Sequence, residues 1–198
     1  FPAGYFRIRA AGTNLYWSVH HGDIHEDGNA LHLYPRHDTD MPEQTFFVNE
    51  KGEFCTRGLG IDVIGTTLII SQSRPPTVPW PNPWSHPLPT FTYSPQSKTI
   101  SVKFHIDPIA SDQWPRAETE WKEPHKHFIV SARPLADVRI HQFNEVSRWA
   151  PSGRFIAWTH HAGHVWNRNH EHALGVVEEK DILESNEMDR IRWVIEQV

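Results

Sequence analysis

The chain has 198 residues and a formal net charge of -5, and 38% of its residues are hydrophobic. This length fits one domain, no apolar run approaches the roughly 20 residues of a membrane helix, and no Lys/Arg cluster provides the basic surface typical of nucleic-acid binders. We therefore expect one soluble domain, covering residues 1–198, that neither spans a membrane nor binds nucleic acid.

The composition also bears on fold class and compartment. The 16 prolines disfavour long helices, and the 9 tryptophans suit broad aromatic surfaces. A single cysteine, Cys55, excludes an internal disulfide framework and favours a reducing compartment such as the cytoplasm. Because the sequence starts at Phe1 rather than Met, a removed signal peptide leaves secretion open as an alternative.

Residues 4–50 predict a first unit of four strands. Residues 5–10, 15–19 and 30–35 alternate apolar and polar side chains with the period of two that half-buried strands show. Residues 45–57, TFFVNEKGEFCTR, then predict a strand with aromatic residues, a turn and a second strand.

The same pattern returns about 45 residues later, over residues 51–97. Residues 60–65 and 67–71, GIDVIG and TLIIS, predict two alternating strands, and 90–104, TFTYSPQSKTISVKF, repeats the strand, turn and strand of the first unit. Between them, residues 74–89, RPPTVPWPNPWSHPLP, have too few backbone donors for a strand and predict an ordered polyproline-type loop.

The C-terminal part predicts a third unit, over residues 98–198. Residues 155–161 match the second strand of the first unit, 173–178 match its third strand, and 191–197 match its fourth. An insertion at residues 105–150 accounts for the greater length of this unit.

The insertion is expected to hold a further strand at residues 126–132 and a short helix around residues 142–149. Three units of four strands, separated by turns, predict an all-β chain folded as a closed β-trefoil. Closure would pair residues 5–10 with residues 191–198, because pairing the first strand with the last removes exposed sheet edges.

An aromatic residue marks the end of each unit, in the triplets QTF, PTF and IRW that end at Phe46, Phe91 and Trp193. These triplets resemble the Gln-x-Trp of the ricin B-like β-trefoil lectins, particularly the disulfide-free members common in mushrooms, although only the first keeps its glutamine, Gln44. The resemblance covers the three units and not the insertion. It implies that the three aromatic side chains share one core. It also implies a non-catalytic carbohydrate-binding protein with glycans or glycoproteins as partners and no cofactor.

The resemblance further implies where a sugar would bind. Sites in that family combine an aspartate, an aromatic platform one strand later, and a polar residue beside the Gln-x-Trp. A carboxylate accepts hydrogen bonds from adjacent sugar hydroxyls, while an aromatic ring stacks on the C–H face of the sugar. Asp62 stands at the aspartate position of the second unit, Tyr34 at the platform position of the first, and Gln44 in the first triplet.

No unit holds both the aspartate and the aromatic platform, so Asp62 would need an aromatic partner from elsewhere. Trp80 and Trp84 in the proline-rich loop are the available donors, and Trp17 is a further candidate. Two structural interpretations compete with these roles. Asp62 could instead bind local backbone amides, and Trp17 could be a core indole.

A protease inhibitor is an alternative function. The proline-stiffened loop of residues 74–89 resembles the rigid loops that the mycocypins present to peptidases, and a rigid loop loses little entropy on docking. Arg74 or Asn82 would then contact the peptidase.

An enzyme or metal site between barrel and insertion is a third hypothesis, with Trp114 and Trp121 as walls. His170 and His172 would face the same side of a strand and offer two metal ligands, but no motif supplies a third. Cys55 has no sequence signal of activation, and the chain lacks a Gly-x-Ser-x-Gly motif, so nothing in the sequence singles out a nucleophile.

Overall fold

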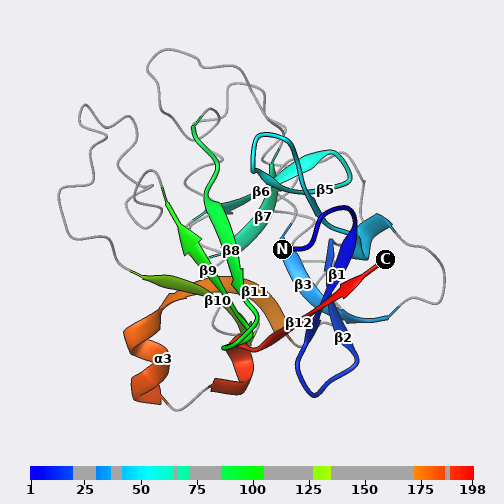
Figure 1. Cartoon of the computed structure of the whole chain (residues 1–198). Coiled ribbons are helices and arrows are strands. Elements are labelled where there is room, and N and C mark those ends of the chain that lie inside the picture. The colour runs from blue at the N-terminus through cyan, green and yellow to red at the C-terminus, as the bar shows by residue number, and fades with distance from the viewer. Residues whose placement is uncertain are drawn as a thin grey trace, which may run out of the picture.

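The structure, a computed structural model, describes residues 1–19, 30–36, 42–64, 67–71, 86–104, 127–134, 172–185 and 188–198. In these ranges the chain forms one 12-stranded antiparallel sheet that curls on itself (Figure 1). The predicted all-β class is therefore confirmed.

Short strands account for most of the described chain, and several bury alternate residues as the period-two pattern predicts. In β9, for example, Ile100 and Val102 face the core while Ser101 is exposed. The elements in chain order are β1 (Phe6–Ala10), β2 (Leu15–Val19), β3 (Leu31–Pro35), η1 (Pro42–Gln44), β4 (Phe47–Val48), β5 (Phe54–Thr56), β6 (Leu59–Ile64), β7 (Thr67–Ser71), β8 (Thr90–Ser94), β9 (Thr99–Lys103), β10 (Phe128–Pro134), β11 (His172–Glu178), α3 (Glu179–Ser185), η4 (Met188–Ile191) and β12 (Trp193–Gln197).

Three antiparallel strand pairs link the ends of the predicted units: β4 with β5, β8 with β9, and β12 with β1. The last of these runs from Phe6 opposite Gln197 to Ala10 opposite Trp193. In Figure 1 the first and last strands lie side by side and both chain termini lie at the same end. The predicted pairing of the opening and closing strands is confirmed.

Three further hairpins join β2 to β3, β6 to β7 and β10 to β11. The later strand of each hairpin also meets the corresponding strand of the other two, so β3, β7 and β11 contact one another pairwise. The residues paired at these three contacts are Ala30 with Ile69, His32 with Ala173, and Thr67 with Gly175.

In the third unit, β11 pairs with a strand from the predicted insertion. The strand predicted at residues 126–132 is present as β10, and it pairs with β11 over seven positions, from Phe128 opposite Glu178 to Pro134 opposite His172. It also pairs with β9. Residues 155–161, predicted as the second strand of this unit, lie outside the described residues, as does the helix predicted at 142–149.

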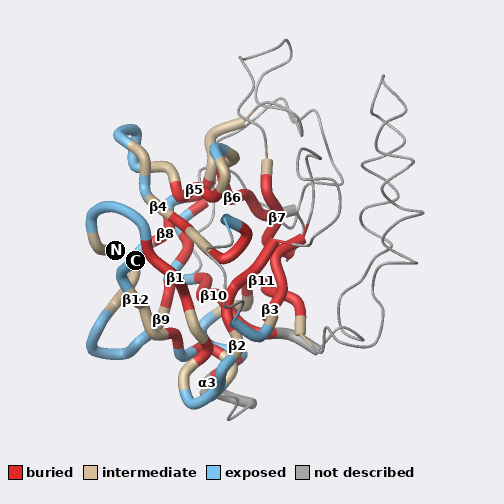
Figure 2. The backbone as a smooth tube through the Cα atoms, turned by 90° about the vertical axis from the view of Figure 1, so that its right-hand side faces the viewer, coloured by how far each residue is buried: buried red, intermediate tan, exposed pale blue. Residues whose placement is uncertain are grey.

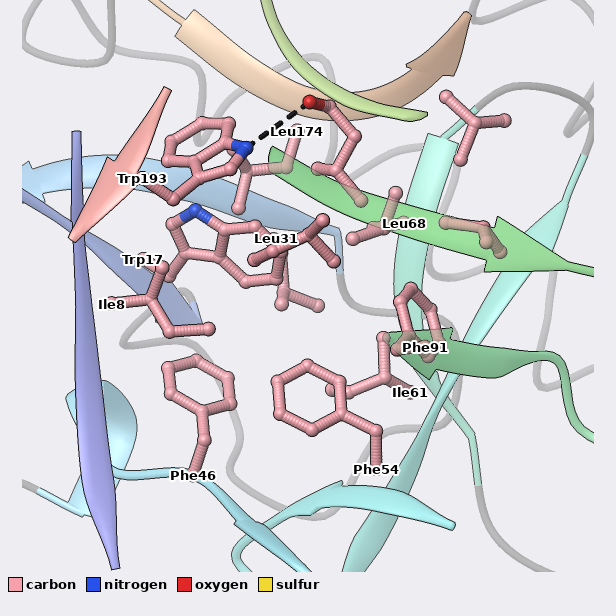
Figure 3. Close-up of a cluster of buried hydrophobic side chains, with 14 of the residues drawn as sticks. Ile8, Trp17, Leu31, Phe46, Phe54, Ile61, Leu68, Phe91, Leu174 and Trp193 are labelled. Atoms are coloured by element: carbon pink, nitrogen blue, oxygen red, sulfur yellow. Dashed lines mark hydrogen bonds between the residues drawn. The ribbon is translucent and has the colours of Figure 1, made fainter. Parts of the chain in front are cut away.

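The core lies inside the curled sheet, and Figure 2 shows buried residues along most of its strands. The aromatic residues that end the three predicted units, Phe46, Phe91 and Trp193, are all buried in the same hydrophobic cluster. Phe54 and Trp17 join them in Figure 3. The predicted burial of the three aromatic residues in one core is thereby confirmed.

A short helix, α3, follows β11, and no repeat pattern in the sequence predicts it. Its Ile182 is buried against Ile129 and Ile191 in a small second cluster, and the backbone NH of Glu179 donates to the carbonyl of His127 at 2.9 Å. Two adjacent apolar residues, Ile182 and Leu183, are too few for periodicity to predict a helix. Among the described residues, no helix has the length and apolar character needed to cross a membrane.

The seam between β1 and β12 carries a polar network on its outer side. Arg9 Nε donates to Glu196 Oε1 at 2.6 Å, and the Tyr16 hydroxyl donates to Glu196 Oε2 at 3.0 Å. Burial raises the pKa of the Glu196 carboxyl, but the hydrogen bonds from Arg9 and Tyr16 outweigh this effect and leave the pKa below its ordinary value. Glu196 therefore ties the last strand to the first two.

We expect Glu196→Gln to make the stability of the fold less dependent on acid pH. A carboxyl whose pKa is lowered by folding stabilises the fold above its unfolded-state pKa of about 4.3, and the contribution is lost as pH falls through the folded-state pKa. At pH 7 the variant should lose less than about 1 kcal/mol, because the side chains of Arg9 and Glu196 are both partly exposed to screening by solvent. Below the folded-state pKa it should match the unsubstituted chain.

The measurement is urea unfolding at a series of pH values from neutral to acid. Glu50→Gln is the matched control. Glu50 is exposed in a turn, and among the described residues it makes no contact across the seam between β1 and β12. A loss of stability that is equal at neutral and acid pH would mean that Glu196 acts through packing and not through its charge.

Candidate functional site

The candidate site is built on β6, where Asp62 is 3% exposed. Its Oδ1 accepts a hydrogen bond from the backbone NH of Val63 at 2.8 Å, and its Oδ2 lies 2.8 Å from Nε2 of His86. Because an ionised carboxylate can only accept, His86 donates this bond through Nε2. Two bonds from two directions fix the carboxylate.

The segment that brings His86 to Asp62 lies along β6. A Cβ added at Gly60 would overlap Cδ1 of Leu88, so Leu88 packs directly against the backbone of β6 at a position where any larger residue would push it away. His86 faces Asp62 and Leu88 faces Gly60, two residues apart on each segment. Residues 86–88 therefore run along β6 in the opposite direction.

This arrangement joins one polar and one apolar contact between segments that are far apart in the chain. An aspartate–histidine pair can bind polar hydroxyls, orient a base, or hold two segments together. For catalysis it would need a nucleophile or a third polar group, and the described residues contain no group of three or more His, Cys, Asp or Glu side chains suited to a metal. The chemistry that these residues support directly is hydrogen bonding by a fixed carboxylate.

Two of the residues predicted to bind a ligand are buried away from the surface. Trp17 is fully buried, and its ring packs edge-to-face on Trp193 with centroids 5.2 Å apart. Gln44 is 1% exposed, and its Nε2 donates to the carbonyl of Pro35 at 3.0 Å. In this structure the Trp17 ring packs in the core, and the Gln44 side chain anchors the chain at Pro35.

Tyr34 lies on β3 and is half-buried. Its ring meets that of His32 edge-to-face, with centroids 6.2 Å apart. Asp62 lies on β6, in a different hairpin. The predicted aromatic platform and the predicted aspartate are thus contributed by different hairpins of the sheet, in keeping with their assignment to different units.

The remaining predicted residues fall mostly outside the described ranges. Trp80, Trp84, Arg74 and Asn82 lie there, as do Trp114, Trp121 and His170. His172 opens β11, and its Nδ1 is buried with no hydrogen-bond partner in the described part of the chain. One histidine with a free nitrogen does not by itself make a metal site.

Cys55 is buried in β5, as the sequence suggests. Burial, followed by the negative charge of Glu53, raises the pKa of its thiol to about 11. Because the thiolate is the reactive form, this cysteine is poorly suited to nucleophilic chemistry near neutral pH.

A second buried carboxylate lies next to Gln44. Glu43 Oε1 accepts a hydrogen bond from Nη1 of Arg57 at 2.9 Å, and both side chains are largely buried. The other oxygen, Oε2, is buried with no partner in the described structure. The pair joins η1 to the turn after β5, where Arg57 itself has a positive φ of 54°.

His86, Leu88 and Gly60 are the site residues that sequence reasoning missed. His86 stands inside the proline-rich loop, 24 residues from its partner Asp62. No local pattern connects residues at such a distance. The sequence offers one indirect signal: Gly60 lies within the strand, two residues before Asp62, and a glycine inside a strand indicates close approach by another segment.

The fold is similar to a solved structure described as the solution structure of the mdaA-1 domain. The two share 12% sequence identity at a TM-score of 0.55, over 100% of this chain and 91% of that chain. At this identity the similarity concerns the fold alone. No protein-family model matches the chain, and no curated protein matches it.

Proposed function

We propose that the chain is a β-trefoil of the ricin B-like lectin type that binds glycans without catalysis. The pairing of strands supports the trefoil. Three strand pairs join the ends of successive units, and three hairpins meet through β3, β7 and β11. This is the threefold arrangement expected of three similar units that close on one another.

The aromatic residues give a second line of support for the trefoil. Phe46, Phe91 and Trp193 end the three units and are buried in one cluster. Equivalent residues of three units that meet around a common axis must converge in this way. The shared cluster of the three aromatic residues agrees with this expectation.

The position and orientation of Asp62 are the main support for the proposed glycan binding. It stands at the strand position that the lectin resemblance assigns to the sugar-binding aspartate, and the Val63 amide fixes its orientation. A carboxylate held in one orientation can accept hydrogen bonds from two neighbouring hydroxyls without losing further conformational entropy. Adjacent hydroxyls on a rigid ring are the defining feature of a sugar.

A glycan array tests this function. We expect the purified chain to give specific signals that fall at least about tenfold in Asp62→Asn, because the amide replaces an acceptor oxygen by a donor and removes the charge that strengthens the bonds. Asp181→Asn is the matched control, since Asp181 is exposed on α3, remote in sequence from the site. An array without signals, or signals that Asp62→Asn leaves unchanged, would contradict the proposal.

Peptidase inhibition is the second candidate, and the contacts of residues 86–88 favour it. Ser71 ends β7, and the described chain resumes at His86, which is bound to Asp62 on the neighbouring strand β6. A segment with one end fixed in this way loses less conformational entropy on docking. Inhibition assays against cysteine and serine peptidases distinguish this candidate. If it holds, Asp62→Asn should weaken peptidase inhibition, and the glycan array should show no signals with either chain.

A further inference from the structure

We infer that residues 86–88 form a strap over Asp62, and that a glycan reaches this carboxylate only after the strap lifts. The inference rests on the proposed glycan binding at Asp62. It adds to that function a closed state of the site, held by contacts within the chain, and a residue, His86, that competes with the ligand for the same carboxylate oxygen.

The two carboxylate oxygens of Asp62 have different hydrogen-bond partners. Oδ1 is bound by the amide of Val63, which belongs to the same strand and stays in place when other segments move. Oδ2 is bound by His86, which is 24 residues away in sequence. Lifting the strap would therefore free one oxygen and leave the carboxylate oriented by the other.

The carboxylate and the imidazole that binds it are both largely buried. The side chain of Asp62 is 4% exposed and that of His86 is 11% exposed. A hydroxyl of a sugar could not approach Oδ2 past an imidazole at 2.8 Å. In this structure the position that would bind the ligand is already occupied by a donor from the chain itself.

Leu88 supplies the second contact of the strap. Its Cδ1 occupies the space that a side chain at position 60 would fill, so Leu88 packs on the backbone of β6 only because residue 60 is glycine. Pro89, the next residue, is buried, and β8 begins at Thr90. The strap is thus joined directly to the sheet at its C-terminal end.

A strap of this kind lowers apparent affinity. A ligand that binds only the open form has an apparent dissociation constant equal to the intrinsic value divided by the open fraction. Removing the imidazole should raise the open fraction. For a site that is open about a tenth of the time or less, His86→Ala should strengthen glycan binding by about tenfold or more.

Carboxyl labelling with a carbodiimide and an amine, read by mass spectrometry, tests the cover without any ligand. We expect Asp62 to react slowly in the unsubstituted chain and about tenfold faster or more in His86→Ala, in proportion to the open fraction. His86→Gln, whose side-chain amide can donate the same bond, should keep labelling slow. His127→Ala is the matched control, because His127 is exposed before β10.

Leu88→Ala provides a second variant that leaves the hydrogen bond intact, and circular dichroism checks that each variant is folded. It should also speed labelling of Asp62. If a folded His86→Ala chain labels no faster than the His127→Ala control, residues 86–88 do not cover the carboxylate and the strap is refuted.

The glycan array, repeated with the same variants, separates the strap from the proposed function. Stronger signals for His86→Ala that disappear when Asp62→Asn is added support both. Signals that need Asp62 but do not rise in His86→Ala overturn the strap and leave the proposed function standing. Faster labelling without glycan signals in any variant overturns the proposed function and, with it, the strap as a control of glycan binding.

Discussion

Phe54→Ala is expected to lower the free energy of unfolding by about 3–5 kcal/mol, the usual cost of removing a fully buried aromatic ring. Phe54 is 2% exposed at the start of β5, where the ends of the first and second units meet. Its ring centroid lies 5.0 Å from that of Phe1, 6.0 Å from Phe6, 6.2 Å from Trp17, 5.5 Å from Phe46 and 5.2 Å from Phe91.

The size of this effect follows from the number of rings that lose a partner. The surrounding aromatic side chains come from several strands and are too rigid to refill the space, so most of the cavity would remain. Urea unfolding followed by tryptophan fluorescence measures the loss. We also expect an unchanged dependence on urea concentration, because the folded chain should keep the same strand pairs.

Phe47→Ala is the matched control, since Phe47 lies on the paired strand β4, opposite Cys55, and is only half-buried. Its ring contacts that of the exposed Tyr5. We expect a loss of about 1 kcal/mol, typical of a partly exposed position. Equal losses for the two variants would show that Phe54 is not the centre of the core.

The strands were the most predictable part of the chain. Period-two alternation located β1 to β3 and β6 to β9, and the 45-residue repeat identified which strands belong to equivalent positions. The pairing of β1 with β12 could also be predicted, because a sheet of repeated units avoids open edges by joining its ends. These predictions depend on patterns that are local or that recur at a fixed interval.

The third unit was harder because inserted residues weaken a repeat. Residues 155–161 resemble Leu15–Val19 closely in composition, whereas β10 resembles it only in alternation. The structure pairs β10 with β11 over seven positions, and this long hairpin also meets β9. Such pairing joins segments that are far apart in the chain, and no local pattern in the sequence reveals it.

Of the candidate site, the sequence singled out Asp62 but none of the residues around it. Asp62 was singled out by its strand position, but the aromatic candidates depended on a distinction that sequence cannot make. In β2 four of the five residues are buried, so alternation does not separate a core indole from an exposed platform at Trp17. His86 and Leu88 reach β6 across a loop, and no local rule predicts such a contact.

Trp193→Phe is expected to destabilise the fold by about 2–4 kcal/mol, and Trp17→Phe by only about 1–2 kcal/mol, although both indoles are fully buried. The indole NH of Trp193 donates to the carbonyl of Val130 at 3.1 Å, which ties β12 to β10 through the interior. The indole nitrogen of Trp17 has no hydrogen-bond partner in the described structure.

The difference between the two variants isolates this hydrogen bond. Each substitution removes a similar volume from the same cluster, since the two rings pack on each other edge-to-face at 87° and Figure 3 shows them side by side. Only Trp193→Phe also takes a donor away from a buried carbonyl, which costs about 1–3 kcal/mol. Urea unfolding of both variants gives the comparison. If Trp17→Phe proved as costly as Trp193→Phe, ring volume alone would determine the stability of the core, and the link between β12 and β10 would add nothing to the closure of the sheet.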